Sequence, residues 1–203
     1  MSGRGRSRHL VTGVRCLAAA LAVAACGPAV RGRAAEPATA AASEDARVVP
    51  DTGAARVLGA PELCFNARDD DGNGLIDEGC GVRTGFVQFV IAWDAPTADV
   101  DLLVTDPKGE LSDVGRPTSS GLVKDRDCPG RHDDCHGKNY ENVYLEKDEA
   151  RRGTYKVSIR LERLEDEDVP IRVTLGARVG PKVYSAEVAF LRAEQKADLA
   201  FDF

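Results

Sequence analysis

The stretch Tyr155-Lys156-Val157-Ser158-Ile159-Arg160-Leu161-Glu162 decides the fold class. Its apolar and polar residues alternate without a break, so every second side chain points to the same face of an extended strand. One face is apolar and the other is polar and charged, which is typical of an antiparallel sheet that covers a core on one side. The stretch therefore predicts a half-buried strand.

The same alternation recurs before and after this strand. Apolar residues occupy alternate positions in segments 87–93, 100–104, 171–177, 184–190 and 199–203. Turn-forming residues separate the segments, as in Asp106-Pro107-Lys108-Gly109 and Gly180-Pro181-Lys182. No stretch after residue 82 has a helical period. Seven or eight short strands over residues 82–203 predict an all-β fold, an antiparallel and jelly-roll-like β-sandwich.

Five motifs of this region follow one another in an order that is typical of one family. They are Phe89-Val90-Ile91-Ala92-Trp93, Asp99-Val100-Asp101-Leu102, Pro107-Lys108-Gly109, Tyr140-Glu141-Asn142 and Gly153-Thr154-Tyr155-Lys156-Val157. Over about residues 86–163 the chain resembles the YfaP-like family of exported domains. It is also similar to the pre-peptidase C-terminal β-domains that accompany secreted enzymes. The resemblance implies a role in binding or stabilisation without turnover.

The N-terminal residues have the pattern of a bacterial export signal. Four arginines precede an apolar run at residues 17–25, and no acidic residue occurs before Glu36. The run is much shorter than the roughly 20 residues that a membrane-spanning helix needs. Val23-Ala24-Ala25-Cys26 resembles the lipobox, which implies cleavage before Cys26 and acylation of Cys26. The alternative is ordinary cleavage after an Ala-x-Ala site and release into the periplasm or the medium.

Removal of residues 1–25 changes the net charge. The full chain carries −6 at neutral pH, and the loss of four arginines leaves −10. This excess of acidic residues argues against nucleic acid or a bare anionic membrane as a partner. No second apolar stretch is long enough to cross a bilayer, so we expect membrane attachment through acyl chains only.

These patterns divide the chain into four parts. Residues 1–25 are the predicted lipoprotein signal peptide, and residues 26–60, rich in Ala, Gly, Pro and Thr, are predicted to form a disordered, flexible tether. Transient helix within the tether is the alternative. Residues 61–81 are predicted to form a cysteine-flanked acidic loop, and residues 82–203 the sandwich.

The remaining cysteines form two local pairs. Apart from Cys26, the chain after residue 25 contains Cys64, Cys80, Cys128 and Cys135. Export leads to an oxidising compartment, so we expect one disulfide within the first pair and one within the second. A bridge that closes a loop of about 15 residues contributes about 3 kcal/mol by restricting the unfolded chain.

The densest group of oxygen ligands lies between Cys64 and Cys80, in Asp69-Asp70-Asp71-Gly72-Asn73-Gly74-Leu75-Ile76-Asp77-Glu78. The pattern D-x-D-x-N-G places alternate carboxylates on a curling loop, and the glycine allows a sharp turn, as in calcium sites. The twelfth position of an EF-hand is occupied here by a cysteine, so another acid must replace its glutamate. We therefore predict calcium bound by Asp69, Asp71, Asn73, the carbonyl of Leu75, and Asp77 or Glu78.

This acidic segment also resembles the short acidic repeats of thrombospondin type 3 and of dockerin. Its five acidic residues have only Arg68 as a nearby basic residue, and they repel one another without a counter-ion. The alternative to a calcium site is a solvated acidic turn that is held only by its disulfide.

A second group of cation ligands is indicated within the sandwich. Asp99 and Asp101 are two residues apart, so they point to the same side of an extended strand. Neighbouring carboxylates attract a metal ion or an arginine. We expect loops to bring further ligands against the two aspartates, namely Asp127, Asn139 and Glu141; the alternative partners are Arg126 and Arg131.

Candidate catalytic residues are few. After residue 25 the only histidines are His132 and His136, and neither has an evident serine or free cysteine to activate. Together with Cys128 and Cys135 they form an alternative zinc set, whose spacing differs from that of the common zinc fingers. We therefore expect no enzymatic activity, and a zinc hydrolase is the least favoured interpretation.

Two functions remain open. One is a calcium-stabilised binding or adhesion module of the cell envelope, as an outer-membrane lipoprotein or at the cell surface. The other is a structural or assembly lipoprotein of the envelope without a metal. One tryptophan and four tyrosines, most of them at strand positions, offer few solvent-facing rings for a glycan. An envelope or extracellular protein is therefore slightly favoured over a glycan as the partner.

Overall fold

The computed structural model describes residues 49–50, 60–130, 135, 137–147, 150–165 and 168–203, all of which belong to one compact unit. Several predictions fall elsewhere in the chain. The signal peptide, Cys26, most of the tether, and both His132 and His136 lie outside the described residues.

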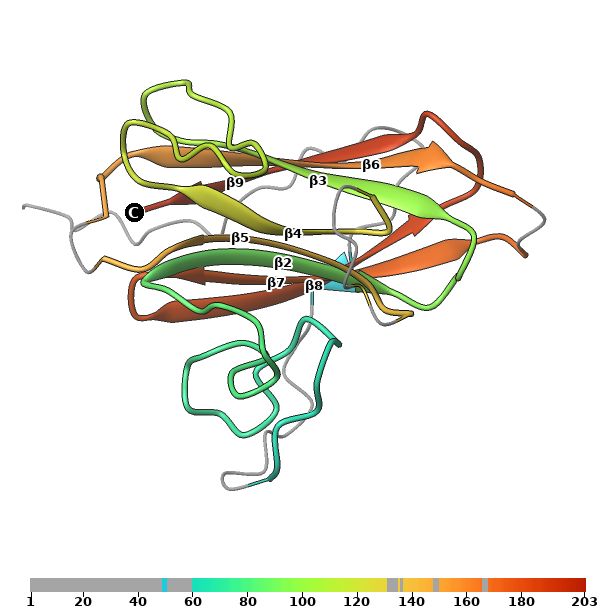
Figure 1. Cartoon of the computed structure of the whole chain (residues 1–203), viewed down its shortest axis with the longest axis horizontal. Coiled ribbons are helices and arrows are strands. Elements are labelled where there is room, and N and C mark those ends of the chain that lie inside the picture. Colours follow the sequence, from blue (N-terminus) through green and yellow to red (C-terminus); the bar gives the residue numbers. More distant parts are fainter. Residues whose placement is uncertain (1–48, 51–59, 131–134, 136, 148–149, 166–167) are drawn as a thin grey trace, which may run out of the picture. The chain divides into compact units, whose positions relative to one another are not determined.

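The strands form two sheets in which every pairing is antiparallel (Figure 1). The larger sheet has the order β1 (Val49–Pro50), β8 (Lys182–Phe190), β7 (Ile171–Val179), β2 (Val87–Trp93), β5 (Asn139–Leu145) and β4 (Val123–Cys128). The smaller sheet has the order β3 (Asp99–Thr105), β6 (Thr154–Arg163) and β9 (Lys196–Asp202). Because the described part of the chain has no helix, the prediction of an all-β sandwich is confirmed. It follows that no helix of this part is long and apolar enough to cross a membrane.

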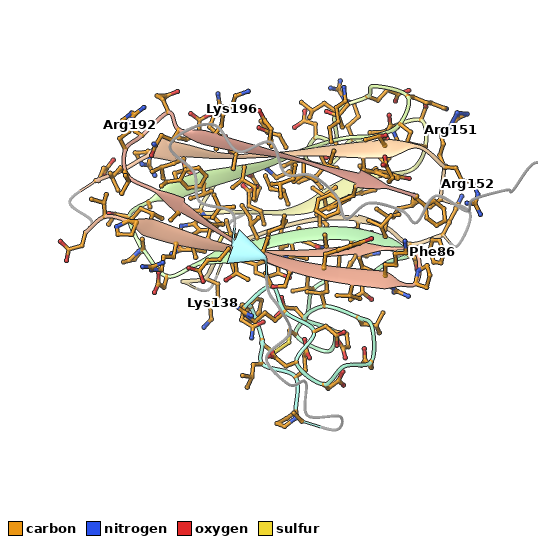
Figure 2. All side chains as sticks on the ribbon, turned by 180° about the vertical axis from the view of Figure 1, so that it is seen from behind. Phe86, Lys138, Arg151, Arg152, Arg192 and Lys196 are labelled. Atoms are coloured by element: carbon orange, nitrogen blue, oxygen red, sulfur yellow. A yellow bond between two sulfur atoms is a disulfide. The ribbon has the colours of Figure 1, made fainter. Side chains whose placement is uncertain are left out.

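The core lies between the two sheets, and side chains fill this space (Figure 2). On β6 the residues Tyr155, Val157, Ile159 and Leu161 are buried, and the polar residues between them are exposed or half-buried. The alternation that predicted this strand is therefore confirmed. Burial of such side chains contributes about 1.5 to 3 kcal/mol each relative to exposure.

Strand β2 is buried on both of its faces. Phe89 and Ile91 belong to the core between the sheets, whereas Val90 and Ala92 belong to a second, smaller apolar cluster. That second cluster includes Ile76 of the acidic loop. The loop therefore covers the outer face of the larger sheet at β2, which explains why β2 has no polar side facing solvent.

The acidic loop packs closely on the larger sheet, on the side away from the smaller sheet (Figure 1). Ala67 and Ile76 are fully buried. The side chain of Gln88 donates a hydrogen bond to the Ile76 carbonyl at 3.3 Å. On β7, a Cβ atom at Gly176 would lie only 2.4 Å from the Ala67 carbonyl oxygen, so the loop backbone approaches the sheet where a side chain is missing. The loop and the sandwich thus share apolar contacts.

The prediction that three ligands of the second group lie on loops is wrong, because they lie on strands β4 and β5. Asp127, Asn139 and Glu141 were expected on loops, but Asp127 lies on β4 and the other two lie on β5. The sequence of these strands lacks regular alternation because polar side chains are buried there with polar partners, as described below. A pattern of apolar residues alone therefore missed the two strands.

The strand β1 lies within the predicted tether. Its two residues pair with β8, Val49 opposite Glu187 and Pro50 opposite Ala186. A proline has no amide hydrogen to donate, so it is tolerated at the edge of a sheet. These two residues extend the larger sheet beyond β8 and cover part of its edge.

Both predicted disulfides are present. Cys64 is bonded to Cys80 and Cys128 to Cys135, with Cα atoms 5.4 Å and 5.5 Å apart. Each bridge closes a short local loop, as the spacing of the cysteines predicted. Disulfides are typical of an oxidising, extracytoplasmic compartment.

Candidate metal centre

The disulfide Cys64–Cys80 gives the acidic loop its frame. It brings the residues just before Cys64 next to those just before Cys80. Glu62 is fixed there, because its Oε1 accepts a hydrogen bond from the Asp77 amide at 2.8 Å and its Oε2 accepts one from the Asp70 amide at 3.0 Å. Glu62 therefore connects the two ends of the loop.

Three carboxylates converge inside this frame. One oxygen from each of Glu62, Asp69 and Asp71 lies within 4.8 Å of the other two. Asp69 is buried, and its Oδ2 accepts a hydrogen bond from the Gly74 amide at 3.1 Å, which holds the loop in a tight curve. Calcium binds oxygens at about 2.3 to 2.6 Å, so three oxygens this close together have nearly the spacing of ligands around one ion.

Asn73 and Glu78 extend this group. The side-chain amide of Asn73 donates hydrogen bonds to Asp71 Oδ2 at 2.9 Å and to Glu78 Oε1. Its Oδ1 accepts one from the Leu75 amide at 2.8 Å. The second oxygen of Glu78, Oε2, is buried and has no hydrogen-bond partner within the described residues. A buried carboxylate oxygen without a partner is unfavourable unless a donor or a cation reaches it.

Asp77 has a different role from the one predicted for it as an alternative ligand. It is fully buried, and its carboxylate accepts hydrogen bonds from the Asn66 and Ala67 amides at 3.2 Å and 2.9 Å. It also accepts one from the Tyr140 hydroxyl on β5 at 3.0 Å. Burial raises the pKa of Asp77, although these hydrogen bonds oppose the shift. Asp77 therefore attaches the loop to the sheet. Glu78, the other predicted alternative, is linked to Asp71 through the side-chain amide of Asn73.

Glu62 is the residue of this group that the sequence analysis missed. It lies outside the D-x-D-x-N-G pattern and enters the group only through the fold of the loop. The available signal was the predicted disulfide, because a bridge from Cys64 to Cys80 limits the distance between residue 62 and residue 78. Burial, opposed by the Asp77 amide, raises the pKa of Glu62, and the nearby Glu78 raises it further.

The structure brings together three of the five residues predicted for the second group. One oxygen from each of Asp101, Asp127 and Glu141 lies within 4.8 Å of the other two. Asp101 comes from the smaller sheet and the other two from the larger sheet. Glu141 is fully buried, and its Oε2 accepts a hydrogen bond from the Leu102 amide at 2.5 Å.

The remaining two residues of that prediction have other partners. Asp99 Oδ2 lies 3.8 Å from the guanidinium of Arg163. Burial and the neighbouring Asp101 raise the pKa of Asp99, and Arg163 lowers it. The side-chain amide of Asn139 donates a hydrogen bond to the Ala95 carbonyl at 2.9 Å.

Lys124 is a second residue that the sequence analysis missed. Its ammonium group lies 3.0 Å from Asp127 Oδ1 and 2.8 Å from Glu141 Oε2, and its side chain is only 7% exposed. Burial lowers the pKa of Lys124, but the two carboxylates outweigh this and raise it. Burial also raises the pKa of Glu141 well above its usual range. Arg126, one of the two expected basic partners, donates a hydrogen bond to the Gly81 carbonyl at 3.2 Å. Arg131, the other expected partner, lies outside the described residues.

The alternative zinc set is not supported at its sulfur ligands. Cys128 and Cys135 are bonded to each other, so neither is available as a thiolate. The two histidines of that set fall outside the described residues.

No protein-family model matches this chain, and neither a curated protein nor a solved structure matches it. The resemblance to YfaP-like domains therefore stays a prediction from the sequence motifs.

Proposed function

We propose that the chain is a non-catalytic, exported and lipid-anchored binding or adhesion module of the bacterial cell envelope, and that calcium bound by its acidic loop stabilises it. The observation that carries this proposal is the convergence of Glu62, Asp69 and Asp71 oxygens within 4.8 Å of one another. All the ligand atoms in this group are carboxylate oxygens, and calcium prefers oxygen ligands.

The other polar groups of the loop fit the same ion. Glu78 Oε2 is buried without a hydrogen-bond partner in the described part of the chain, and a cation would satisfy it. The amide of Asn73, which donates to Asp71 and Glu78, offers an oxygen when its side chain turns over. The ligands proposed for calcium are Glu62, Asp69, Asp71, Asn73, the Leu75 carbonyl and Glu78.

Calcium in this loop would stabilise more than the loop. Ile76 and Asp77 lie between the proposed ligands and the sheet, where Ile76 belongs to an apolar cluster with Val90. Asp77 accepts the hydrogen bond of Tyr140 on β5. An ion that orders the loop therefore also favours the contacts between the loop and the larger sheet.

The distribution of aromatic side chains supports a protein partner over a glycan. Trp93, Tyr140, Tyr144 and Tyr155 are all buried. Where the loop meets the sheet there is a cavity of about 190 Å³, lined by Phe65, Cys80, Gly81, Arg126, Cys128, Cys135, Lys138 and Tyr140. Lys138, labelled in Figure 2, has its ammonium group 5.7 Å from the centre of the Phe65 ring. This junction is a surface that only the assembled loop and sandwich provide.

The envelope location has two supports. The first is the sequence of residues 1–26, with its basic start, short apolar run and lipobox-like end. The second is the pair of disulfides, which are stable in the periplasm and outside the cell. Both supports are independent of calcium.

Thermal unfolding with and without calcium tests the metal part of the proposal. Extracellular calcium modules bind with dissociation constants of about 0.1 to 1 mM. A calcium concentration of 10 mM is then about 10 to 100 times the dissociation constant, and binding stabilises the folded state by about 1.4 to 2.7 kcal/mol. We therefore expect the melting temperature of the purified protein to be about 3 to 10 °C higher in 10 mM calcium than in chelator.

The variant Asp71→Asn removes one proposed ligand and should lose most of this increase. Glu146→Gln is the matched control, because Glu146 is an exposed acid outside the loop and should keep the full increase. If Asp71→Asn gains as much from calcium as the wild type does, the acidic loop is not the calcium site.

A further inference from the structure

Strand β3 of the smaller sheet lies over β4 and β5 of the larger sheet (Figure 1). One carboxylate from each of these three strands converges there. β3 is an edge strand of the smaller sheet, so the amide of Leu102 is free of a neighbouring strand on that side and donates to Glu141 instead. Asp101 and Asp127 approach the same carboxylate from β3 and β4. The group joins the two layers of the sandwich.

The contacts of Glu141 are incomplete. Its Oε2 has two partners, the Leu102 amide and the Lys124 ammonium group. Its Oε1 is buried and has no hydrogen-bond partner within the described residues. Because Glu141 is 0% exposed, bulk water does not supply that partner. Buried carboxylate oxygens normally have a donor or a metal ion beside them. The unpartnered oxygen belongs to the same carboxylate that lies within reach of Asp101 and Asp127.

The charges of the group are also incomplete. Asp101, Asp127 and Glu141 carry three negative charges when ionised. Lys124 supplies one positive charge among them, and the guanidinium of Arg160 lies 3.5 Å from Asp101 Oδ2. These two basic residues leave a surplus of one negative charge. Asp127 and Lys124 are buried, so water screens this surplus only weakly.

We propose that Asp101, Asp127 and Glu141 bind a divalent cation of the calcium type, at a site separate from the acidic loop. The proposed ligands are carboxylate oxygens, which suit a hard cation. The side chain of Asp101 is 26% exposed, which leaves an entry for the ion and room for water to complete its coordination. Lys124 remains beside the ion, where it offsets part of the negative charge and limits the affinity.

Terbium is the probe for this site. It binds at calcium sites and emits light after energy transfer from an excited tryptophan. The only tryptophan, Trp93, pairs across β2 and β5 with Asn139, two residues before Glu141. The titration uses a protein whose acidic loop is disabled by Asp69→Asn and Asp71→Asn together. This background separates the second site from the site of the proposed function, so either can fail without the other.

We expect the loop-disabled protein to retain one saturable site, with terbium emission that excess calcium reverses. Adding Asp101→Asn, at the partly exposed edge of the group, should weaken binding at least tenfold. Adding Lys124→Met should instead tighten binding at least tenfold, because a positive charge next to the ion is removed. The matched control is Lys196→Met, which removes an exposed lysine at the far edge of the smaller sheet and should change nothing.

Two results would overturn the proposal. One is a loop-disabled protein whose circular dichroism is that of the wild type but which gives no saturable terbium emission. The other is a Lys124→Met variant that binds terbium no more tightly than its parent, because a plain buried ion pair predicts loss of stability without any gain in cation affinity.

Discussion

Replacing Glu141 by alanine is expected to lower the free energy of unfolding by about 4 kcal/mol. The change removes the acceptor of the Leu102 amide and one of the two carboxylates that contact Lys124. It leaves a buried lysine with one partner and a buried amide with none, and both losses are costly away from water. Urea unfolding followed by tryptophan fluorescence measures the effect.

Glu187→Ala is the matched control for this prediction. Glu187 lies 2.9 Å from the guanidinium of Arg172, nearly the same separation as between Glu141 and Lys124, but its side chain is 37% exposed. Exposed ion pairs contribute about 0 to 1 kcal/mol, so the control should change stability little. Equal losses in the two variants would show that burial does not determine the importance of Glu141.

Replacing Ile76 by alanine is the second large effect, with an expected loss of about 3 kcal/mol. Ile76 is fully buried between the acidic loop and β2, and its truncation leaves a cavity at this contact. The weaker contact should also let the Ala67 amide, which donates to Asp77, exchange its hydrogen faster. Calorimetry measures the stability, and hydrogen exchange measures the opening of the loop.

Leu63→Ala provides the comparison within the same segment. Leu63 is also a large apolar residue, but it is 59% exposed. Its truncation should cost less than about 0.5 kcal/mol and leave the exchange of Ala67 unchanged. If Ile76→Ala is as mild as Leu63→Ala, then the loop is not anchored by its apolar side.

The sequence predicted those parts of the fold in which one physical effect dominates. In β3, β6, β7 and β9, hydrophobic burial on one face produces strict alternation, and the segments were placed to within a few residues. The disulfides were predicted from the spacing of the cysteines. In an exported protein, cysteines that are close in sequence tend to form disulfides with each other.

The strands β4 and β5 were missed because their buried residues are polar. Lys124 and Glu141 form a buried ion pair between the two strands, so neither strand shows a regular apolar face. Such pairing depends on contacts between residues that are distant in sequence, which a local pattern does not contain. The same reason explains why Lys124 was not recognised as a member of the second carboxylate group.

The candidate calcium loop was predicted in part. The positions of Asp69, Asp71 and Asn73 follow from the local pattern. A side-chain oxygen of each residue accepts a hydrogen bond from a backbone amide two to five residues later. Glu62 was missed because it joins the group from outside the pattern. Asp77 was predicted as a possible ligand from its place in the acidic segment. Its hydrogen bond to Tyr140 depends on the packing of the loop against β5, which the local sequence does not contain.

A diffraction experiment on crystals grown in calcium tests the central claim most directly. The claim is that the acidic loop, folded against the larger sheet, holds a calcium ion between Glu62, Asp69 and Asp71. We predict an anomalous difference peak within about 2.3 to 2.6 Å of an oxygen of each of these residues. A well-ordered loop with only water between the three carboxylates, at calcium concentrations above 10 mM, would contradict the claim.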